Sequence, residues 1–156
     1  MPWNDRNIYQ TARKSAGITQ ERAAETLNIS VESIRAYETG LRLPPNEVVD
    51  QMIVVYNAQV LAYQHIRESA NFARNGIPEI TQMDLPVAAM RLINRIYQFA
   101  DKHQDRELMK IAEDGAIDSS ERQKFDEITD ELNEIVRAAL ELRCSKQTGP
   151  GISDKL

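Results

Sequence analysis

The sequence has 156 residues, of which 42% are hydrophobic and 28% are charged, and its net charge is −5. This length and composition fit one folded domain, or a small domain with an appended module, and they exclude a chain that is disordered throughout. The acidic charge argues against general polyanion binding, and because no apolar run approaches the roughly 20 residues of a membrane span, we expect a cytoplasmic protein without membrane contact.

Apolar residues recur at spacings of three and four along nearly the whole chain, which predicts an all-α protein. Residues that cap or break helices divide this pattern. The predicted helices are Asn4 or Asp5 to about Ser15, Thr19 to Leu27, Ser30 to Thr39, Asn46 to Tyr56, Ala58 to Asn75, a long helix from Asp84, and Asp118 to about Arg143. The polar stretch from Asp101 to Arg106 either interrupts the long helix or lies within it.

The segments between the predicted helices carry residues that suit turns. Gly17 follows the first helix and Asn28 separates the second from the third, and both residue types accept a left-handed conformation. Asp114-Gly115 predicts the turn before the last helix. Glu121 stands three residues after Asp118, which is the spacing of a capping box.

The second and third predicted helices are short, and the turn between them is too brief for antiparallel packing. The two helices must therefore cross steeply, which is the geometry of a helix-turn-helix unit. Ala24 is small where two helices have to approach. The apolar residues that can close a small core between these helices are Ile18, Ala23, Ala24, Leu27, Ile29, Ile34 and Tyr37.

With these features, residues 5–57 resemble the lambda-repressor-like (XRE) helix-turn-helix family. The residues that carry the resemblance are Arg13, Gly17, Ile18 to Glu21, Ala24, Leu27, Ile29, Ser30, Ile34, Glu38, Gly40, Arg42 and Pro44. The resemblance implies a five-helix domain that binds double-stranded DNA. It also implies a structural ion pair between Arg13 and Glu38, contacts to phosphates or bases from Thr19 and Gln20, and an exposed reading edge from Ser30 to Ala36.

The side chains of the third helix allow specific base contacts. Arg35 favours guanine or a phosphate, and Glu32 could accept a hydrogen bond from cytosine N4 at an electrostatic cost. Val31 and Ala36 could touch thymine methyl groups. The predicted DNA-binding residues are Lys14, Thr19, Gln20, Ser30, Val31, Glu32, Ser33, Arg35, Ala36 and Arg42. So few cations predict weak binding by a single copy, which implies a homodimer.

The last predicted helix carries an apolar stripe at heptad spacing, and the helix after Asp84 repeats the pattern. The stripe of the last helix is Phe125, Ile128, Leu132, Ile135, Ala139 and Leu142, and that of the earlier helix is Leu85, Ala89, Leu92, Ile96 and Phe99. Either an antiparallel hairpin buries both stripes within one chain, or the stripes form a coiled-coil dimer. Additional apolar residues, namely Ile93, Tyr97, Val136 and Leu140, would also allow a hairpin that dimerises. We predict the stripe of the last helix as a dimer or partner surface.

The second half also resembles, through fewer motifs, the helical C-terminal half of XRE-type regulators from Gram-positive bacteria and their mobile elements. These motifs are Tyr56 to Ala58, Asp84 to Pro86, Ile111 to Gly115, Ile117 and Glu121. We therefore expect a DNA-binding domain over residues 1–75, a helical hairpin over residues 76–143 and a flexible tail over residues 144–156.

No pattern for catalysis or cofactor binding stands out. Cys144 is the single cysteine, and His65 and His103 lie too far apart for zinc-ligand spacing. A glycine-rich phosphate loop and a nucleophile motif are both absent from the sequence. We expect neither an enzyme nor a bound metal, cofactor or small-molecule substrate.

Two hypotheses for function follow. The first is a sequence-specific, dimeric transcription regulator of repressor type that reads an inverted repeat in the major groove. The second is a protein-interaction module on the same scaffold, such as an adaptor, an anti-repressor or an antitoxin-like subunit, with little DNA binding.

Overall fold

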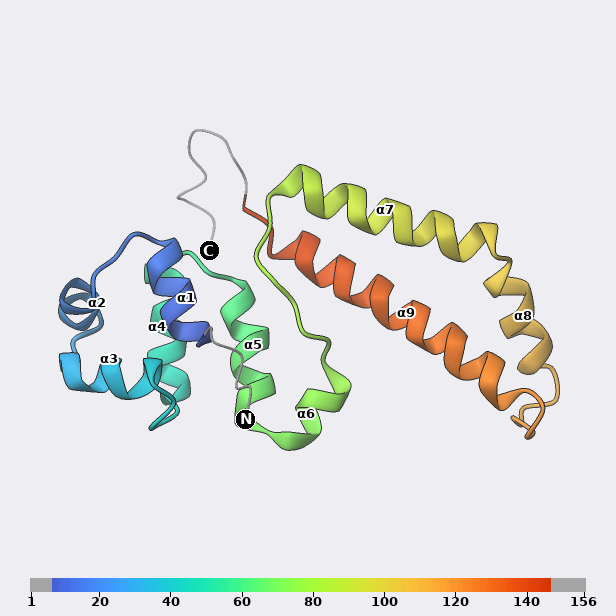
Figure 1. The fold of residues 1–156 in the computed structure, drawn as a ribbon, viewed down its shortest axis with the longest axis horizontal. Helices are drawn as coiled ribbons and strands as arrows, with labels where there is room; N and C mark the ends of the chain where they lie inside the picture. The colour runs from blue at the N-terminus through green and yellow to red at the C-terminus, as the bar shows by residue number, and fades with distance from the viewer. Residues whose placement is uncertain (1–6, 147–156) are drawn as a thin grey trace. The chain divides into compact units, whose positions relative to one another are not determined.

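The structure is a computed structural model that describes residues 7–146 of the chain. Within this range every regular element is a helix, labelled α1 to α9 in Figure 1, and the strand-like pairing is limited to an isolated bridge between Asp84 and Lys146. The all-α prediction is therefore confirmed. The chain divides into two units between Glu79 and Ile80. None of the helices in the described range is long and apolar enough to cross a membrane.

The first unit contains six helices in its described part. They are α1 (Ile8–Ser15), α2 (Gln20–Leu27), α3 (Val31–Glu38), α4 (Asn46–Val55), α5 (Val60–Ser69) and α6 (Asn71–Gly76). The predicted caps of α2 and α3 are confirmed, because the Thr19 and Ser30 hydroxyls accept hydrogen bonds from the backbone N–H groups of Arg22 and Ser33. Each cap satisfies a backbone donor that the first helical turn leaves without a partner.

The cap of α1 differs from the prediction. Asn7 is the capping residue, and its side-chain oxygen accepts hydrogen bonds of 3.0 Å from the N–H groups of Tyr9 and Gln10. The same side chain donates to the backbone oxygen of Tyr37 at 2.8 Å. This contact with the end of α3 favours Asn7 over the predicted Asn4 or Asp5, which lie outside the described residues.

The single helix predicted from Ala58 to Asn75 is wrong, because the chain forms two helices there. Ala70 is extended, with φ −145° and ψ 125°, and separates α5 from α6. Two arginines hold α6 against the end of α5: Arg67 donates to the backbone oxygens of Arg74 and Ile77, and Arg74 donates to the backbone oxygen of Arg67. These tertiary bonds override a local sequence that suits a continuous helix.

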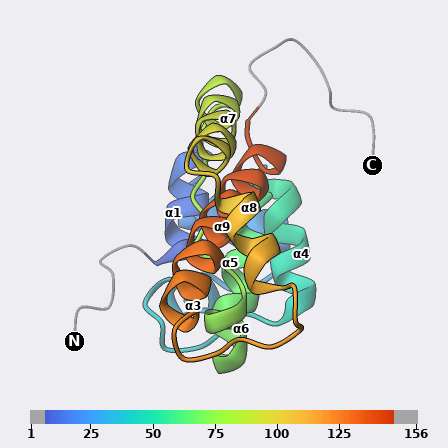
Figure 2. The same cartoon turned by 90° about the vertical axis from the view of Figure 1, so that its right-hand side faces the viewer.

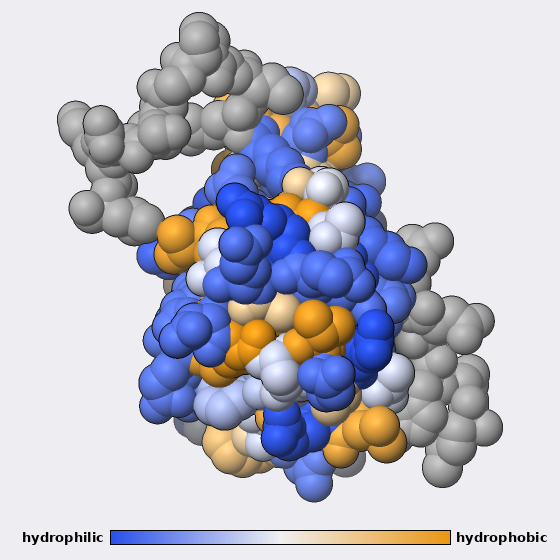
Figure 3. Space-filling model, turned by 90° about the vertical axis from the view of Figure 1, so that its left-hand side faces the viewer, coloured by the Kyte–Doolittle hydropathy of each residue, from blue (hydrophilic) through white to orange (hydrophobic). Residues whose placement is uncertain are grey.

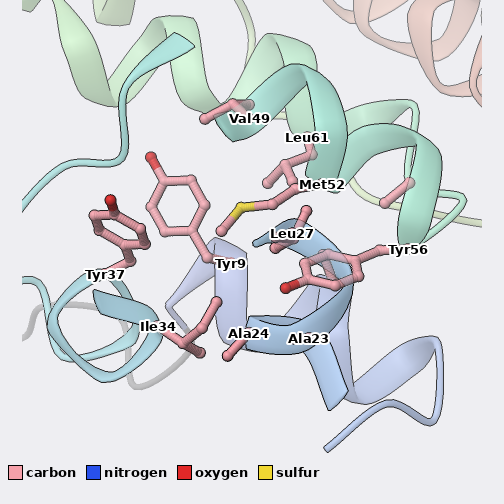
Figure 4. Close-up of a cluster of buried hydrophobic side chains, with 12 residues drawn as sticks. Tyr9, Ala23, Ala24, Leu27, Ile34, Tyr37, Val49, Met52, Tyr56 and Leu61 are labelled. Atoms are coloured by element: carbon pink, nitrogen blue, oxygen red, sulfur yellow. The ribbon is translucent and has the colours of Figure 1, made fainter. Parts of the chain in front are cut away.

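A hydrophobic cluster at the centre of the first unit joins α1 to α5 (Figure 4). Ala23 and Ala24 are almost fully buried, and their small side chains let neighbouring helices approach α2 closely. The larger buried residues of the cluster are Tyr9, Leu27, Ile34, Tyr37, Val49, Met52, Tyr56 and Leu61. The cluster fixes α3 on one face and leaves the opposite face of that helix at the surface.

The second unit contains α7 (Leu85–Asp101), α8 (Gln104–Ile111) and α9 (Arg122–Arg143) in the described range. α7 packs along α9, and α8 joins the two at one end (Figures 1 and 2). His103 has a positive φ of 54°, so the polar stretch from Asp101 to Arg106 does interrupt the long helix. The reciprocal bonds of the predicted capping box are present, because Glu121 accepts from the N–H of Asp118 and Asp118 accepts from the N–H of Glu121. They lie in the turn before α9, however, and the capping residue of that helix is Glu121 rather than the predicted Asp118.

The apolar stripe of α9 faces α7 for most of its length, as the intramolecular hairpin requires. Ile128 and Ala138 are buried in this contact. Ala139, which we had placed on the stripe, is exposed instead. A straight α-helix has 3.6 residues per turn rather than 3.5, so a strict heptad stripe drifts around it, and the buried positions move to Ala138 and Glu141 near the end of α9.

A buried carboxylate closes the open end of the hairpin. The Glu141 side chain is fully buried and pairs with Arg91 of α7 at 2.8 Å and with Arg137 at 3.4 Å. It also accepts hydrogen bonds from the backbone and side chain of Thr81. The carboxylate thus ties together α9, α7 and the segment that enters α7.

Part of the predicted flexible tail is packed instead. Cys144 is buried, and the backbone of Lys146 exchanges hydrogen bonds with Met83 and Leu85 at 3.2 and 3.3 Å. The segment that enters α7 thus supplies hydrogen-bond partners for the backbone of Lys146, a long-range contact that the local sequence does not indicate. Residues 147–156 lie outside the described part of the chain.

Candidate nucleic-acid interface

α2 and α3 are joined by the short turn on which a helix-turn-helix depends. Asn28 adopts the left-handed conformation with φ 52° and ψ 45°, as predicted, and ends α2. The N–H of Ile29 then bonds to the oxygen of Ala24 at 3.0 Å, and Ser30 caps α3. One residue in the left-handed conformation is enough to change the direction of the chain, because its positive φ cannot continue a right-handed helix. The turn fixes the direction of α3 relative to α2.

An ion pair lies beneath this surface. Arg13 Nε and Nη2 lie 2.5 and 2.9 Å from the two carboxylate oxygens of Glu38, and both side chains are almost fully buried. Burial on its own raises the pKa of Glu38, but the hydrogen bonds from Arg13 and Gln20 outweigh it and leave that pKa below its usual value. The hydrogen bond to Glu38 likewise raises the pKa of Arg13. Both groups are therefore charged at neutral pH.

The ion pair is connected to the surface through Gln20. The Gln20 amide nitrogen donates to Glu38 Oε2 at 2.9 Å, so its amide oxygen points the other way. That oxygen lies 3.5 Å from Arg35 Nε, at the long limit of a hydrogen bond. A polar chain thus runs from Arg13 through Glu38 and Gln20 to Arg35. The amide of Gln20 could adopt either of two orientations, and the buried carboxylate of Glu38 selects the one in which the amide nitrogen faces it.

The outward face of α3 carries Glu32 and Arg35 as exposed side chains and Ala36 as a half-buried one. Val31 was predicted to be exposed on the reading edge, but it is half-buried and packs against the hydrophobic cluster. Thr39 was not among the predicted residues, although it is exposed and lies three residues beyond Ala36, one turn along the same face. Helical spacing from Glu32 would have found it.

The hydroxyl groups of Ser30 and Ser33 form hydrogen bonds at the start of α3. The hydroxyl of Ser30 caps α3, and the two hydroxyls lie 3.0 Å apart. The hydroxyl of Ser33 also accepts a hydrogen bond of 3.0 Å from Arg42. Both residues remain near the start of α3, where backbone N–H groups favour an anion.

Arg42 is held against α3 by the connection that follows that helix. Its guanidinium lies 5.0 Å from the ring centre of Tyr37, in the arrangement of a cation–π contact. The N–H of Arg42 also bonds to the backbone oxygen of Ala36 at 3.2 Å. Sequence reasoning placed Arg42 near DNA but could not find this stacking, because it depends on the path of the connection.

Other cations surround this surface sparsely. Lys14 is exposed at the end of α1. Arg22 pairs with Glu25 at 2.7 Å across one exposed turn of α2, and such pairs hold a side chain only weakly. The side on which α2 and α3 lie is shown in Figure 3, where hydrophilic side chains separate small hydrophobic patches. Lys14, Arg22 and Arg35 are therefore the available cations on this part of the unit.

A second polar cluster stabilises the unit behind this surface. His65 Nδ1 lies 2.8 Å from the Tyr9 hydroxyl, and His65 Nε2 lies 2.9 Å from the side-chain oxygen of Asn46. An amide oxygen only accepts, so Nε2 carries the hydrogen and Nδ1 accepts from the tyrosine. Burial lowers the pKa of His65, which keeps the ring neutral. Within the described residues, no group of histidine, cysteine and carboxylate side chains is arranged to hold a metal ion.

Residues 10–62 match a protein-family model described as a helix-turn-helix domain. The match includes α2, α3 and α4 in full, so the chain carries an N-terminal helix-turn-helix domain. A comparison with curated proteins returned no match, and neither did a comparison with solved structures.

Proposed function

We propose that the chain is a dimeric, sequence-specific DNA-binding transcription regulator of the XRE type, which acts as a repressor by occupying its site. In this proposal α3 enters the major groove and the N-terminus of α2 lies against the DNA backbone. The match to a helix-turn-helix domain supports DNA binding by the first unit. The base contacts, the dimer and repression are our inferences from the residues.

The observation that carries the proposal is the polar chain from Arg13 to Arg35. A buried ion pair positions the amide of Gln20, and that amide lies beside the guanidinium of the exposed Arg35. The buried ion pair thus positions Gln20 at the surface before DNA arrives, with the exposed Arg35 beside it. Such an arrangement lowers the entropic cost of binding.

Each outward side chain of α3 then has a role that its chemistry permits. Arg35 donates to guanine O6 and N7, and Glu32 accepts from cytosine N4. Ala36 contacts a thymine methyl group, while Thr19 and Gln20 meet phosphates beside the N-terminus of α2. Glu32 repels phosphates and therefore lowers the affinity for DNA in general. A site that places a cytosine beside Glu32 offsets this repulsion with a hydrogen bond, so that site is preferred.

Dimer formation follows from the small number of available cations. Phosphate contacts supply much of the affinity of a protein for DNA, and two copies double their number without new residues. A two-fold axis would place the two copies of α3 in successive major grooves, roughly 34 Å apart. The expected site is an inverted repeat with half-sites at that spacing.

The direct test is selection from random duplex DNA by the purified full chain at moderate salt. The expected result is an enriched inverted repeat, and enrichment should disappear in the variant that carries both Gln20→Ala and Arg35→Ala. Lys110→Ala, which removes an exposed cation of α8, is a matched control and should select the same sequence. Failure of the unmodified chain to enrich any sequence would contradict the proposal.

The alternative, a protein-interaction module, is favoured by one observation. Leu41 and Leu43, in the connection after α3, are 83% and 46% exposed and lie beside the proposed DNA surface. The salt dependence of DNA binding separates the two functions, because its slope scales with the number of neutralised phosphates. A regulator gives a steep slope that becomes shallower in Arg35→Ala, whereas an interaction module gives a slope near zero.

A further inference from the structure

The stripe that we expected to form a dimer is largely used within the chain, which leaves the dimer without an assigned surface. Most of the apolar side of α9 packs on α7. The opposite side of α7, however, also carries large apolar side chains. Met90, Ile93 and Tyr97 are 65%, 48% and 63% exposed. We propose that this outward face of α7 binds a second copy of the chain, with the two α7 helices antiparallel.

The face is continuous along the helix. Met90, Ile93 and Tyr97 follow one another at spacings of three and four, so they share one side of α7. Pro86 precedes them on that side and Asp101 follows them. A row of this length, exposed on the outside of a helical hairpin, is the surface from which a four-helix bundle of two hairpins is built. Isolated apolar residues would not form such a row.

The charges of α7 favour a second copy over another partner. Arg91 and Arg95 are directed toward α9, where they pair with Glu141 and Glu134. The outward face therefore carries no charge between Pro86 and Ala100. A charged peptide would find no unpaired complementary group there. An anionic lipid surface would find only Arg91 and Arg95 near the apolar row, and both guanidinium groups are already paired with glutamates of α9. An identical uncharged face meets it without repulsion, although the whole chain carries a net charge of −5.

The one charge at the end of this face selects the antiparallel orientation. Asp101 lies in the last turn of α7. In a parallel pair it would face Asp101 of the second copy, and like charges would repel. In an antiparallel pair it lies beside the start of the other α7, where the helix dipole favours a negative group.

Two-fold symmetry then fixes which residues meet. With the axis between Ile93 and Asn94, Met90 of each copy faces Tyr97 of the other, and Pro86 faces Asp101. A methionine sulfur beside an aromatic ring is a favourable contact, and this arrangement makes it twice. The interface is self-complementary without further adjustment of the sequence.

This inference rests on the proposed function only for the need for two copies, and its test requires no DNA. The mass of the full chain in solution is measured by sedimentation equilibrium for the unmodified protein and for variants whose helix content is checked by circular dichroism. The unmodified chain should be a dimer. Met90→Lys alone and Tyr97→Glu alone should each halve the mass at the same concentration.

The double variant with Met90→Lys and Tyr97→Glu distinguishes the orientation. In the antiparallel pair each lysine faces a glutamate, so the dimer should return, whereas a parallel pair would place like charges together and stay dissociated. Met109→Lys, on an exposed methionine of α8, is the matched control and should leave the dimer intact.

Three results would overturn the interface: a monomeric unmodified chain, a dimer that Met90→Lys leaves unchanged, or a double variant that remains monomeric. A chain that dimerises through α7 but selects no DNA would contradict the proposed function and leave the interface standing. A chain that selects DNA and whose dimer is unaffected by Met90→Lys would support the proposed function and contradict the interface.

Discussion

At the scale of single residues, the first unit depends on a few buried polar side chains that are fully paired. Glu38 receives hydrogen bonds from Arg13 and Gln20, and its carboxylate lies beneath the proposed DNA surface. The sequence pattern suggested the ion pair through a resemblance, but it did not indicate that Gln20 joins it. That contact depends on side-chain directions across two helices, which spacing along the chain does not specify.

Removal of the buried carboxylate should be strongly destabilising. Glu38→Gln leaves the Arg13 guanidinium buried without its counter-charge, and breaking a buried pair in this way costs about 3–5 kcal/mol. The free energy of unfolding, measured by urea titration, should fall by that order. Glu25→Gln, which breaks the exposed pair with Arg22, is the control and should cost about 1 kcal/mol or less. Equal effects from the two variants would contradict the assigned role of burial.

The buried histidine should make the stability of the first unit sensitive to acid. Burial lowers the pKa of His65 in the folded chain, so between that pKa and the unfolded value of about 6.5 the unfolded chain binds more protons. The contribution of His65 is present above about pH 6.5 and is lost as the pH falls below it.

The check is urea unfolding at pH 7.5 and at pH 5. His65→Gln, which cannot titrate in this range, should show a smaller loss between the two pH values than the unmodified chain. His103→Asn removes the exposed histidine at a left-handed position that asparagine accepts, and it should leave the loss unchanged. An equal loss in His65→Gln and in the unmodified chain would rule out His65 as the group responsible.

At the scale of elements, the sequence predicted what is decided locally. The caps Thr19 and Ser30 and the turn at Asn28 could be read because a side chain there bonds to a backbone only a few residues away. The break at Ala70 could not be predicted from the sequence, because hydrogen bonds between α5, α6 and the segment after them stabilise it. The packing of Arg42 on Tyr37 was missed for the same reason.

The turn of the helix-turn-helix offers a direct test of this local control. Asn28 has φ 52°, and a residue with an ordinary Cβ pays about 1–2 kcal/mol for that conformation, whereas glycine does not. Asn28→Ala should therefore lower the midpoint of thermal unfolding measured by circular dichroism, and Asn28→Gly should leave it nearly unchanged or raise it. A larger loss in the glycine variant would mean that the asparagine side chain, rather than its backbone, stabilises the turn.

At the scale of the whole molecule, the proposed functions are divided between the two units, with DNA reading in the first and association in the second. The spacing of apolar residues predicted the helical hairpin, but it did not distinguish the side that packs within the chain from the side that remains exposed. Both sides of α7 carry apolar residues, so only the observed packing of α9 separates them. The exposure of Glu32 and Arg35 on the proposed reading face was predictable, because they lie at positions that the helix exposes, whereas the partial burial of Val31 was not.

A second DNA selection with Glu32→Ala, compared with the unmodified chain, tests whether the outward face of α3 reads DNA. If α3 reads the major groove as proposed, the preference for one base pair should relax in both half-sites, at symmetric positions, while the remaining positions keep theirs. Affinity for unrelated DNA should rise, because a negative charge has left the surface. An unchanged selected sequence, together with unchanged affinity for unrelated DNA, would show that this face of α3 does not contact DNA.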